Sequence, residues 1–151
     1  MTLEWNDSFS TGLIDIDAQH RALIRLTNQL SAALDAGEGE ARVGELVLFL
    51  EQYVLWHFDQ EEGCMHRYHC PMAAANDRAH AQFRALLLTY RERFNQEGAS
   101  NQLATDLLGH LKGWMINHIL RIDTSLIVCV RAAGEEIAAS QTPRPGPPTD
   151  P

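Results

Sequence analysis

Seven polar side chains spread along the sequence have the types and the spacing to hold metal ions. They are His20, His57, Glu61, Asn76, His80, His118 and Asp123. Two pairs, His57 with Glu61 and Asn76 with His80, are four residues apart. An α-helix turns by about 100° per residue, so the members of such a pair lie within roughly 40° of each other on one helix face. Each pair can therefore aim both of its side chains at one point.

The residues that share a helix face with these side chains are mostly apolar, so folding is expected to bury the carboxylates of Glu61 and Asp123. An unpaired, ionised carboxylate in an apolar interior costs many kcal/mol, in a domain whose whole stability is roughly 5–15 kcal/mol. No Lys or Arg lies on these faces near the two acids. A metal is the natural counter-charge, and imidazoles with carboxylates suit transition metals rather than calcium or magnesium. The two carboxylates could bridge two such ions.

A simpler interpretation is that these histidines are core residues. A single histidine on an apolar stripe is more often hydrogen-bonded within the core than bound to a metal. This interpretation fits His110 best, and it would fit His20 if that residue stood alone. It does not fit the set, because four helices would each have to bury polar groups at matching depth by accident.

The elements that must position these residues are four segments with an apolar period of about 3.6 residues, and no segment alternates like a half-buried strand. We expect helices over residues 18–35, 40–66, 72–96 and 101–135. Short connections between them favour an all-α, up-down-up-down four-helix bundle. An N-terminal arm without periodicity is expected to run extended before the first helix.

The ends of these helices carry capping residues. Asp15 or Asp17 is predicted to cap the first helix, and Ser100 is predicted to cap the fourth. Gly37 and Gly98 are predicted to end the first and third helices.

The fourth helix poses a geometric problem. His118 and Asp123 are five residues apart, which an ideal helix would separate by about 140°. Either the carboxylate reaches around from a flanking position, or the helix contains a local π-type widening.

The chain of 151 residues, 45% of them hydrophobic, is long enough for one domain with a real core. We expect that domain over residues 1–136 and a flexible, disordered Pro-rich tail over 137–151. The net charge of −8, without a cluster of Lys or Arg, argues against nucleic acids and anionic membranes as partners. A monomer is expected.

The location is predicted to be cytoplasmic, because the sequence shows neither a secretory leader nor an apolar stretch of about 18 residues. Cys64, Cys70 and Cys129 make an odd number without a framework spacing, which predicts free thiols. The nearby group formed by Cys64, His66, His69 and Cys70 matches no zinc spacing. We therefore interpret its members as loop residues rather than an accessory metal or redox site.

Four sequence blocks resemble motifs of a known family. They are LEWNDSFSTGLIDIDAQHRALI, HFDQEEGCM, AHAQF and WMINHILRID. On these blocks the chain resembles the hemerythrin family, in particular the single-domain bacteriohemerythrins, over nearly its whole length to about Val130. The resemblance implies two iron ions in a non-haem di-iron centre, oxo- or hydroxo-bridged, that binds dioxygen reversibly.

The resemblance also implies a role for each residue of the set. Glu61 and Asp123 would bridge the irons. The histidines would form two pairs, His20 with His57 on one iron and His80 with His118 on the other. The implied function is oxygen storage, transport or sensing, with no catalytic residue and with a separate redox partner protein.

Asn76 departs from the family pattern, which has a further histidine four residues before His80. An Asn oxygen is a poorer donor to iron than an imidazole, or it can hydrogen-bond a water that takes the position. Three outcomes are open: a di-iron centre with one iron held more loosely, an oxidase-, peroxidase-like or NO-reactive enzyme, or a site that keeps one metal. We favour the first. His69 is not expected to replace the missing histidine, because Pro71 interrupts the helix between them.

Six apolar residues are expected to surround the centre and to form a pocket for dioxygen. They are Leu23, Phe58, Phe83, Trp114, Met115 and Ile119. Apolar walls limit the access of water and protons to such a centre. The same residues are also ordinary core residues, so the pocket is a second role for them. An oxygen-binding protein is the preferred function, an enzyme is the alternative, and an iron-handling or interaction module with a degenerate site is a third class.

Overall fold

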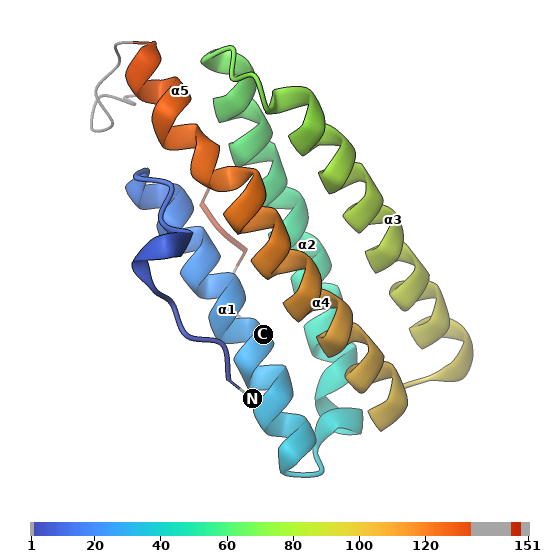
Figure 1. The fold of residues 1–151 in the computed structure, drawn as a ribbon. Coiled ribbons are helices and arrows are strands. Elements are labelled where there is room, and N and C mark those ends of the chain that lie inside the picture. Colours follow the sequence, from blue (N-terminus) through green and yellow to red (C-terminus); the bar gives the residue numbers. More distant parts are fainter. Residues whose placement is uncertain (1, 134–145, 149–151) are drawn as a thin grey trace.

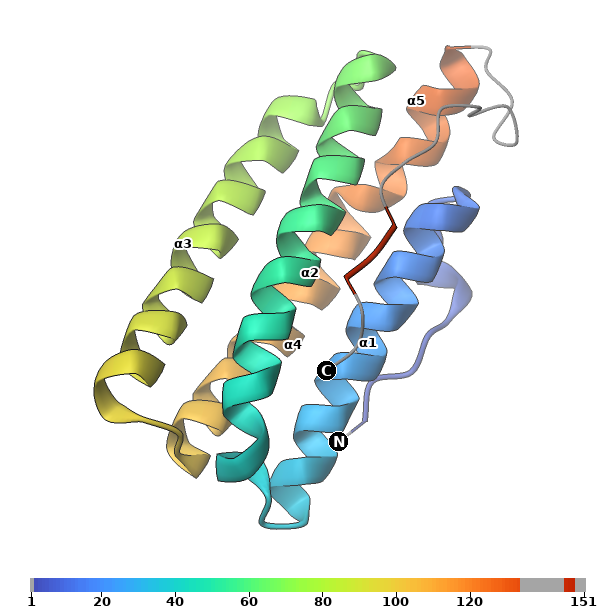
Figure 2. The same ribbon diagram turned by 180° about the vertical axis from the view of Figure 1, so that it is seen from behind.

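The computed structural model describes residues 2–133 and 146–148, and within them the protein is helical without any strand. The elements are η1 (Asp7–Phe9), α1 (Ile14–Asp35), α2 (Gly39–Arg67), α3 (Ala73–Glu97), α4 (Asn101–Arg121), η2 (Asp123–Ser125) and α5 (Leu126–Ala132). Figure 1 shows α1 to α4 running up and down side by side, and Figure 2 shows the same arrangement from behind. Each of the four contacts its neighbours around one core. The predicted all-α four-helix bundle is confirmed.

Three predicted helix ends are confirmed. Gly37 has φ 76°, and its N–H donates to the carbonyl of Leu34 at 3.0 Å. Gly98 ends α3 with φ 77°. At the start of α4 the Ser100 hydroxyl accepts a hydrogen bond from the N–H of Leu103 at 3.0 Å. Left-handed glycines and a Ser cap satisfy backbone groups that a helix end leaves without partners.

The prediction that Asp15 or Asp17 caps the first helix is wrong. The helix begins at Ile14 and its N-cap is Leu13, which makes no side-chain cap. Asp17 is buried and accepts hydrogen bonds at 2.7 Å from the N–H and the hydroxyl of Thr11. Its carboxylate therefore anchors the loop before α1 instead of capping the helix.

The N-terminal arm is fastened to the bundle. The backbone N–H and carbonyl of Leu3 both bond the side chain of Asn28 at 2.8 Å. Phe9 of η1 is buried, and η1 contacts α4. The arm thus covers the bundle where α1 and α4 meet.

The prediction of one continuous helix over residues 101–135 is also wrong. The fourth helix ends at Arg121, Ile122 has φ −119° and ψ −59°, and the 3₁₀ turn η2 precedes the separate helix α5. No π-type widening is present between residues 101 and 133. The break turns the chain so that Asp123, the first residue of η2, faces the bundle interior. The predicted helix end at Glu135 and the domain boundary at 136 lie outside the described residues, as does most of the predicted tail.

The second helix, α2, ends at Arg67, before Pro71, and backbone hydrogen bonds close its end. His69 has φ 51°, and the N–H of Cys70 donates to the carbonyl of Met65 at 2.8 Å. The N–H of His69 donates to the carbonyl of His66 at 3.2 Å. These two bonds form a Schellman motif with His69 in the left-handed position that glycine usually takes.

Cys70 and Cys129 form a disulfide with their Cα atoms 5.4 Å apart, so the prediction of free thiols is wrong for both. Their separation of 59 positions conceals the pairing in the sequence. The break after Arg121 brings α5 beside the end of α2, where both cysteines join a second apolar cluster with Met65 and Leu126. Cys64 takes no part in this disulfide.

No described helix combines the length and the apolar character that crossing a membrane requires.

Reduction of the Cys70–Cys129 disulfide is expected to lower the free energy of unfolding by about 4 kcal/mol, since cross-linking residues 59 apart restricts the unfolded chain. Urea unfolding of the wild type with and without a thiol reductant measures this difference. Cys129→Ser should reproduce the reduced curve, and Cys64→Ser should keep the difference between the oxidised and reduced curves. Identical midpoints with and without reductant would show that the bond does not stabilise the fold.

Candidate metal centre

All seven predicted residues lie in the interior of the bundle, and none has more than 5% of its surface exposed. They come from five elements: His20 from α1, His57 and Glu61 from α2, Asn76 and His80 from α3, His118 from α4, and Asp123 from η2. Each of the four long helices therefore directs at least one imidazole into the core.

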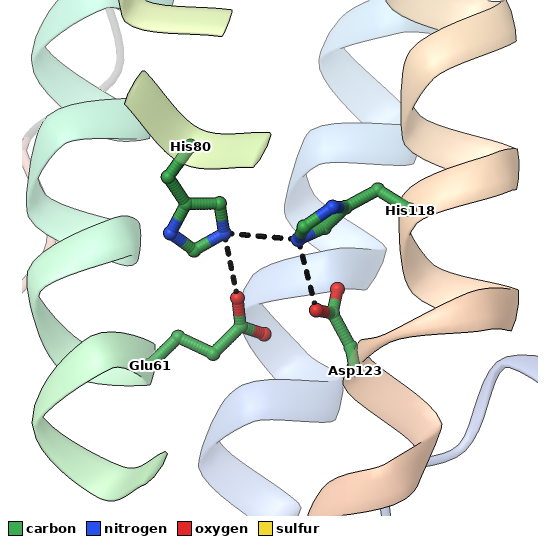
Figure 3. A group of neighbouring side chains, drawn as sticks. All are labelled: Glu61, His80, His118 and Asp123. Atoms are coloured by element: carbon green, nitrogen blue, oxygen red, sulfur yellow. Dashed lines mark hydrogen bonds and ion pairs between the residues drawn. The ribbon is translucent and has the colours of Figure 1, made fainter. Parts of the chain in front are cut away.

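Glu61, His80, His118 and Asp123 form the first group that could hold an ion, with one ligand atom of each within 4.8 Å of the others. The Nε2 atoms of His80 and His118 are 3.0 Å apart. Nε2 of His80 is 3.1 Å from Oε2 of Glu61, and Nε2 of His118 is 3.0 Å from Oδ1 of Asp123. Figure 3 shows the four side chains pointing toward one another from three sides.

His20, His57 and Glu61 form the second group, again within 4.8 Å. Oε1 of Glu61 is 3.3 Å from Nε2 of His20 and 3.8 Å from Nε2 of His57. Asp123 also approaches this group, since its Oδ2 is 3.2 Å from Nε2 of His20. Each carboxylate thus presents one oxygen to each group, which is the arrangement that bridging two ions requires.

The donor atoms fit metal ions better than they fit one another. Four residues of the centre have buried polar atoms that make no hydrogen bond: His20, Glu61, Asn76 and Asp123. The ring nitrogens of His20 and the carboxylate oxygens of Glu61 and Asp123 lie close together, yet they form no hydrogen bonds with one another. Bond lengths of about 2.1 Å, as for imidazole on zinc, place two donors at right angles about 3.0 Å apart. The distances between neighbouring donors here are of that size.

The electrostatics also show a shortage of positive charge. Burial lowers the pKa of His20, but the adjacent carboxylates of Asp123 and Glu61 outweigh this effect and raise that pKa to about 10. Burial lowers the pKa of His57 to about 4. Burial alone would raise the pKa of Glu61, yet the imidazoles of His57, His20 and His80 hold it well below its usual range. In the metal-free protein, a proton on His20 therefore takes the place of a cation.

Two histidines have their outer ring nitrogen fixed by a neighbouring side chain. Nδ1 of His57 is 2.7 Å from the amide oxygen of buried Gln19, and Nδ1 of His80 is 2.9 Å from Oε1 of Glu62. An acceptor at Nδ1 keeps the proton there and leaves Nε2 as a lone pair facing the centre. Sequence reasoning assigned no role to Gln19 or Glu62, although each directly adjoins a predicted ligand, His20 or Glu61.

The six predicted pocket residues all lie in or against the main core cluster. Phe58 stacks on His80 with ring centroids 3.6 Å apart, and Trp114 stacks on His118 at 4.3 Å. Phe83 stacks on Trp114 at 4.1 Å. Aromatic rings therefore cover one half of the centre. The others are Leu23, Met115 and Ile119, which are all buried.

Asn76 is fully buried, and neither its amide oxygen nor its amide nitrogen makes a hydrogen bond. It lies one helical turn before His80 on the same face of α3. A buried amide without partners costs about 1–3 kcal/mol, so its surroundings favour a ligand that satisfies it.

The remaining histidines lie away from the centre. His110 is exposed and hydrogen-bonds the hydroxyl of Tyr90, so it is not the core residue that was expected. His66 pairs with Asp77 at 2.7 Å on the surface, and His69 belongs to the turn after α2. Neither belongs to a group that could hold a metal within the described part of the chain.

Comparisons with known proteins point the same way. The sequence model of the hemerythrin HHE cation binding domain matches residues 11–128. A bacteriohemerythrin of Pseudomonas aeruginosa is 30% identical over 93% of this chain and 89% of its own length. A bacteriohemerythrin of Stenotrophomonas maltophilia is 33% identical over 86% and 82%, and one of Methylococcus capsulatus is 26% identical over 82% and 92%.

The metal-free protein is expected to be most stable near pH 6.5 and less stable on either side. Between pH 6.5 and about 10 the unfolded chain has lost the proton that folded His20 keeps, so stability falls as pH rises. Between pH 6.5 and about 4, His57 binds a proton in the unfolded chain but not in the folded protein, so stability falls as pH drops.

Thermal unfolding in the presence of a chelator, at pH values across this range, measures both effects. His20→Gln should remove the alkaline decline and keep the acid one. A melting temperature that does not change above pH 6.5 would contradict the raised pKa of His20.

Proposed function

The chain belongs to the hemerythrin family, and we propose that it holds two iron ions in this centre and binds dioxygen reversibly there. The observation that carries the proposal is the placement of Glu61 and Asp123 between two groups of imidazoles, with one oxygen of each carboxylate facing each group. His20 and His57 would hold one iron, and His80 and His118 the other. A reduced iron pair supplies the electrons that reversible binding of dioxygen needs.

The protein's own residues then perform three tasks. Gln19 and Glu62 contact Nδ1 of His57 and His80, so that the Nε2 lone pairs face the site that would hold the irons. Phe58 and Trp114 stack on the imidazoles of one half and restrict their rotation. The buried apolar side chains exclude water and protons, which favours release of dioxygen over its reduction.

Asn76 adds an amide to the half that contains His80 and His118. We propose that the iron there still binds but is held more loosely than it would be with a third imidazole, because an amide oxygen is the poorer donor. The unpartnered amide of Asn76 also favours a second candidate function, an oxidase, peroxidase-like or NO-reactive enzyme that uses the position beside it. Steady turnover of peroxide with an electron donor would identify that activity.

We place this function in the cytoplasm, in a monomer that a separate redox protein keeps reduced. The net charge of −8 opposes self-association and binding to anionic membranes. In that compartment the Cys70–Cys129 disulfide would meet thiol reductants, so its state in cells is worth measuring.

Anaerobically prepared protein is expected to contain two irons per chain and to gain a visible absorption band with dioxygen that vacuum removes. Metal analysis and absorbance during repeated cycles measure both properties. Glu61→Ala should abolish both, because it removes the carboxylate shared by the two groups. Well-folded protein that stays free of iron under iron-replete growth would refute the proposal.

Asn76→His is expected to slow the loss of iron to a chelator by about tenfold or more and to slow oxidation of the reduced centre, because it adds an imidazole donor. Stopped-flow absorbance with a ferrous chelator measures the first effect. Asn117→His is the matched control, since Asn117 is exposed and immediately precedes His118 on α4. Equal rates in both variants would mean that residue 76 does not face the metal.

A further inference from the structure

The imidazole of His80 is held more firmly than ring packing alone would hold it. Its Nδ1 lies 2.9 Å from Oε1 of Glu62. Phe58 lies on the same helix, one turn before Glu62. The ring of Phe58 stacks on the imidazole with centroids 3.6 Å apart and planes 5° from parallel. A hydrogen bond at the edge and an aromatic ring on the face together fix the direction of Nε2.

Arg84 holds both of these supports in place. Its Nη1 is 2.9 Å from Oε1 of Glu62, the same oxygen that contacts His80. Its guanidinium lies over the ring of Phe58, 5.2 Å from the centroid. Arg84 lies one turn after His80 on α3, so the arrangement joins α2 to α3 beside the centre.

The other half of the centre has a weaker support of the same kind. Nδ1 of His57 meets the amide oxygen of Gln19, which is neutral. A carboxylate that accepts the Nδ1–H bond makes an imidazole a stronger donor through Nε2 than a neutral acceptor does. The carboxylate of Glu62 thus supports the half of the centre that contains Asn76 and His80.

We propose that Glu62, held by Arg84, is a positioning residue that strengthens His80 as a metal donor and so offsets the weak donor Asn76. This inference rests on the proposed metal centre. Glu62 itself does not touch the metal: it acts only through Nδ1 of His80. With this support, the half that has lost an imidazole keeps its metal.

The variant that tests the proposal is Glu62→Gln, which keeps the size of the side chain and removes its charge. Asp59→Asn is the matched control, because Asp59 lies on the same helix and contacts Arg84 at 3.5 Å without contacting His80. Titration of the metal-free full-length protein with Co²⁺, followed by its visible spectrum, gives the affinity of each half. Glu62→Gln is expected to weaken one of the two halves by about 10–100-fold, and Asp59→Asn to change neither.

The offset of Asn76 has its own test in the double variant. In the Asn76→His background the added imidazole supplies the missing donor strength, so Glu62→Gln should cost less than in the wild type. Equal losses in both backgrounds would show that Glu62 does not compensate for Asn76. A loss in Glu62→Gln no larger than in Asp59→Asn would overturn the role of Glu62 altogether.

A measurement on metal-free protein distinguishes a failure of this inference from a failure of the proposed function. In the metal-free protein, the Nδ1–H proton of His80 should give a downfield NMR signal that moves upfield in Glu62→Gln and stays in place in Asp59→Asn. Wild-type protein that shows this signal but binds no Co²⁺ or iron would refute the metal centre and leave the Glu62–His80 bond established. Absence of the signal would refute the bond itself.

Discussion

Two buried carboxylates impose the constraint on which the rest of this structure depends. Glu61 and Asp123 are wholly removed from solvent, and within the described chain their ion-pair partners are imidazoles. A proton on His20 balances part of their charge, yet it leaves oxygens of both acids without hydrogen bonds. An interior with this excess of acceptors is complementary to cations rather than to itself, and the four helices bring matching donors to it from separate parts of the sequence.

The break between α4 and α5 places Asp123 in the interior, as that constraint requires. A regular helix would hold the side chains of His118 and Asp123 about 140° apart. Ending α4 at Arg121 replaces a continuous helix by the 3₁₀ turn η2, which directs Asp123 inward. The short α5 that results would be poorly stable alone, because it has seven residues. Its attachment comes from the second apolar cluster and from the Cys70–Cys129 disulfide.

Local sequence patterns were enough to predict the parts of the structure that depend on local spacing. The pairs at four-residue spacing, His57 with Glu61 and Asn76 with His80, fall on inward faces because helical geometry dictates it. The break at Ile122 and the disulfide were not predictable in this way, since both depend on contacts between segments distant in the sequence. The same holds for Asp17: its capping signal was real, but the loop before the helix competed successfully for its carboxylate.

The proposed role of Asn76 in place of a histidine ligand is compatible with the constraint, because such a replacement changes donor strength and leaves charge alone. An imidazole and an amide are both neutral ligands, so the two carboxylates still call for the same total positive charge. In the proposed centre, Glu61 and Asp123 therefore set the positive charge that the interior calls for, and neutral donors and their neighbours set the difference between the two halves. Gln19 on one side and Glu62 on the other show that this second level of control is built into residues next to the ligands.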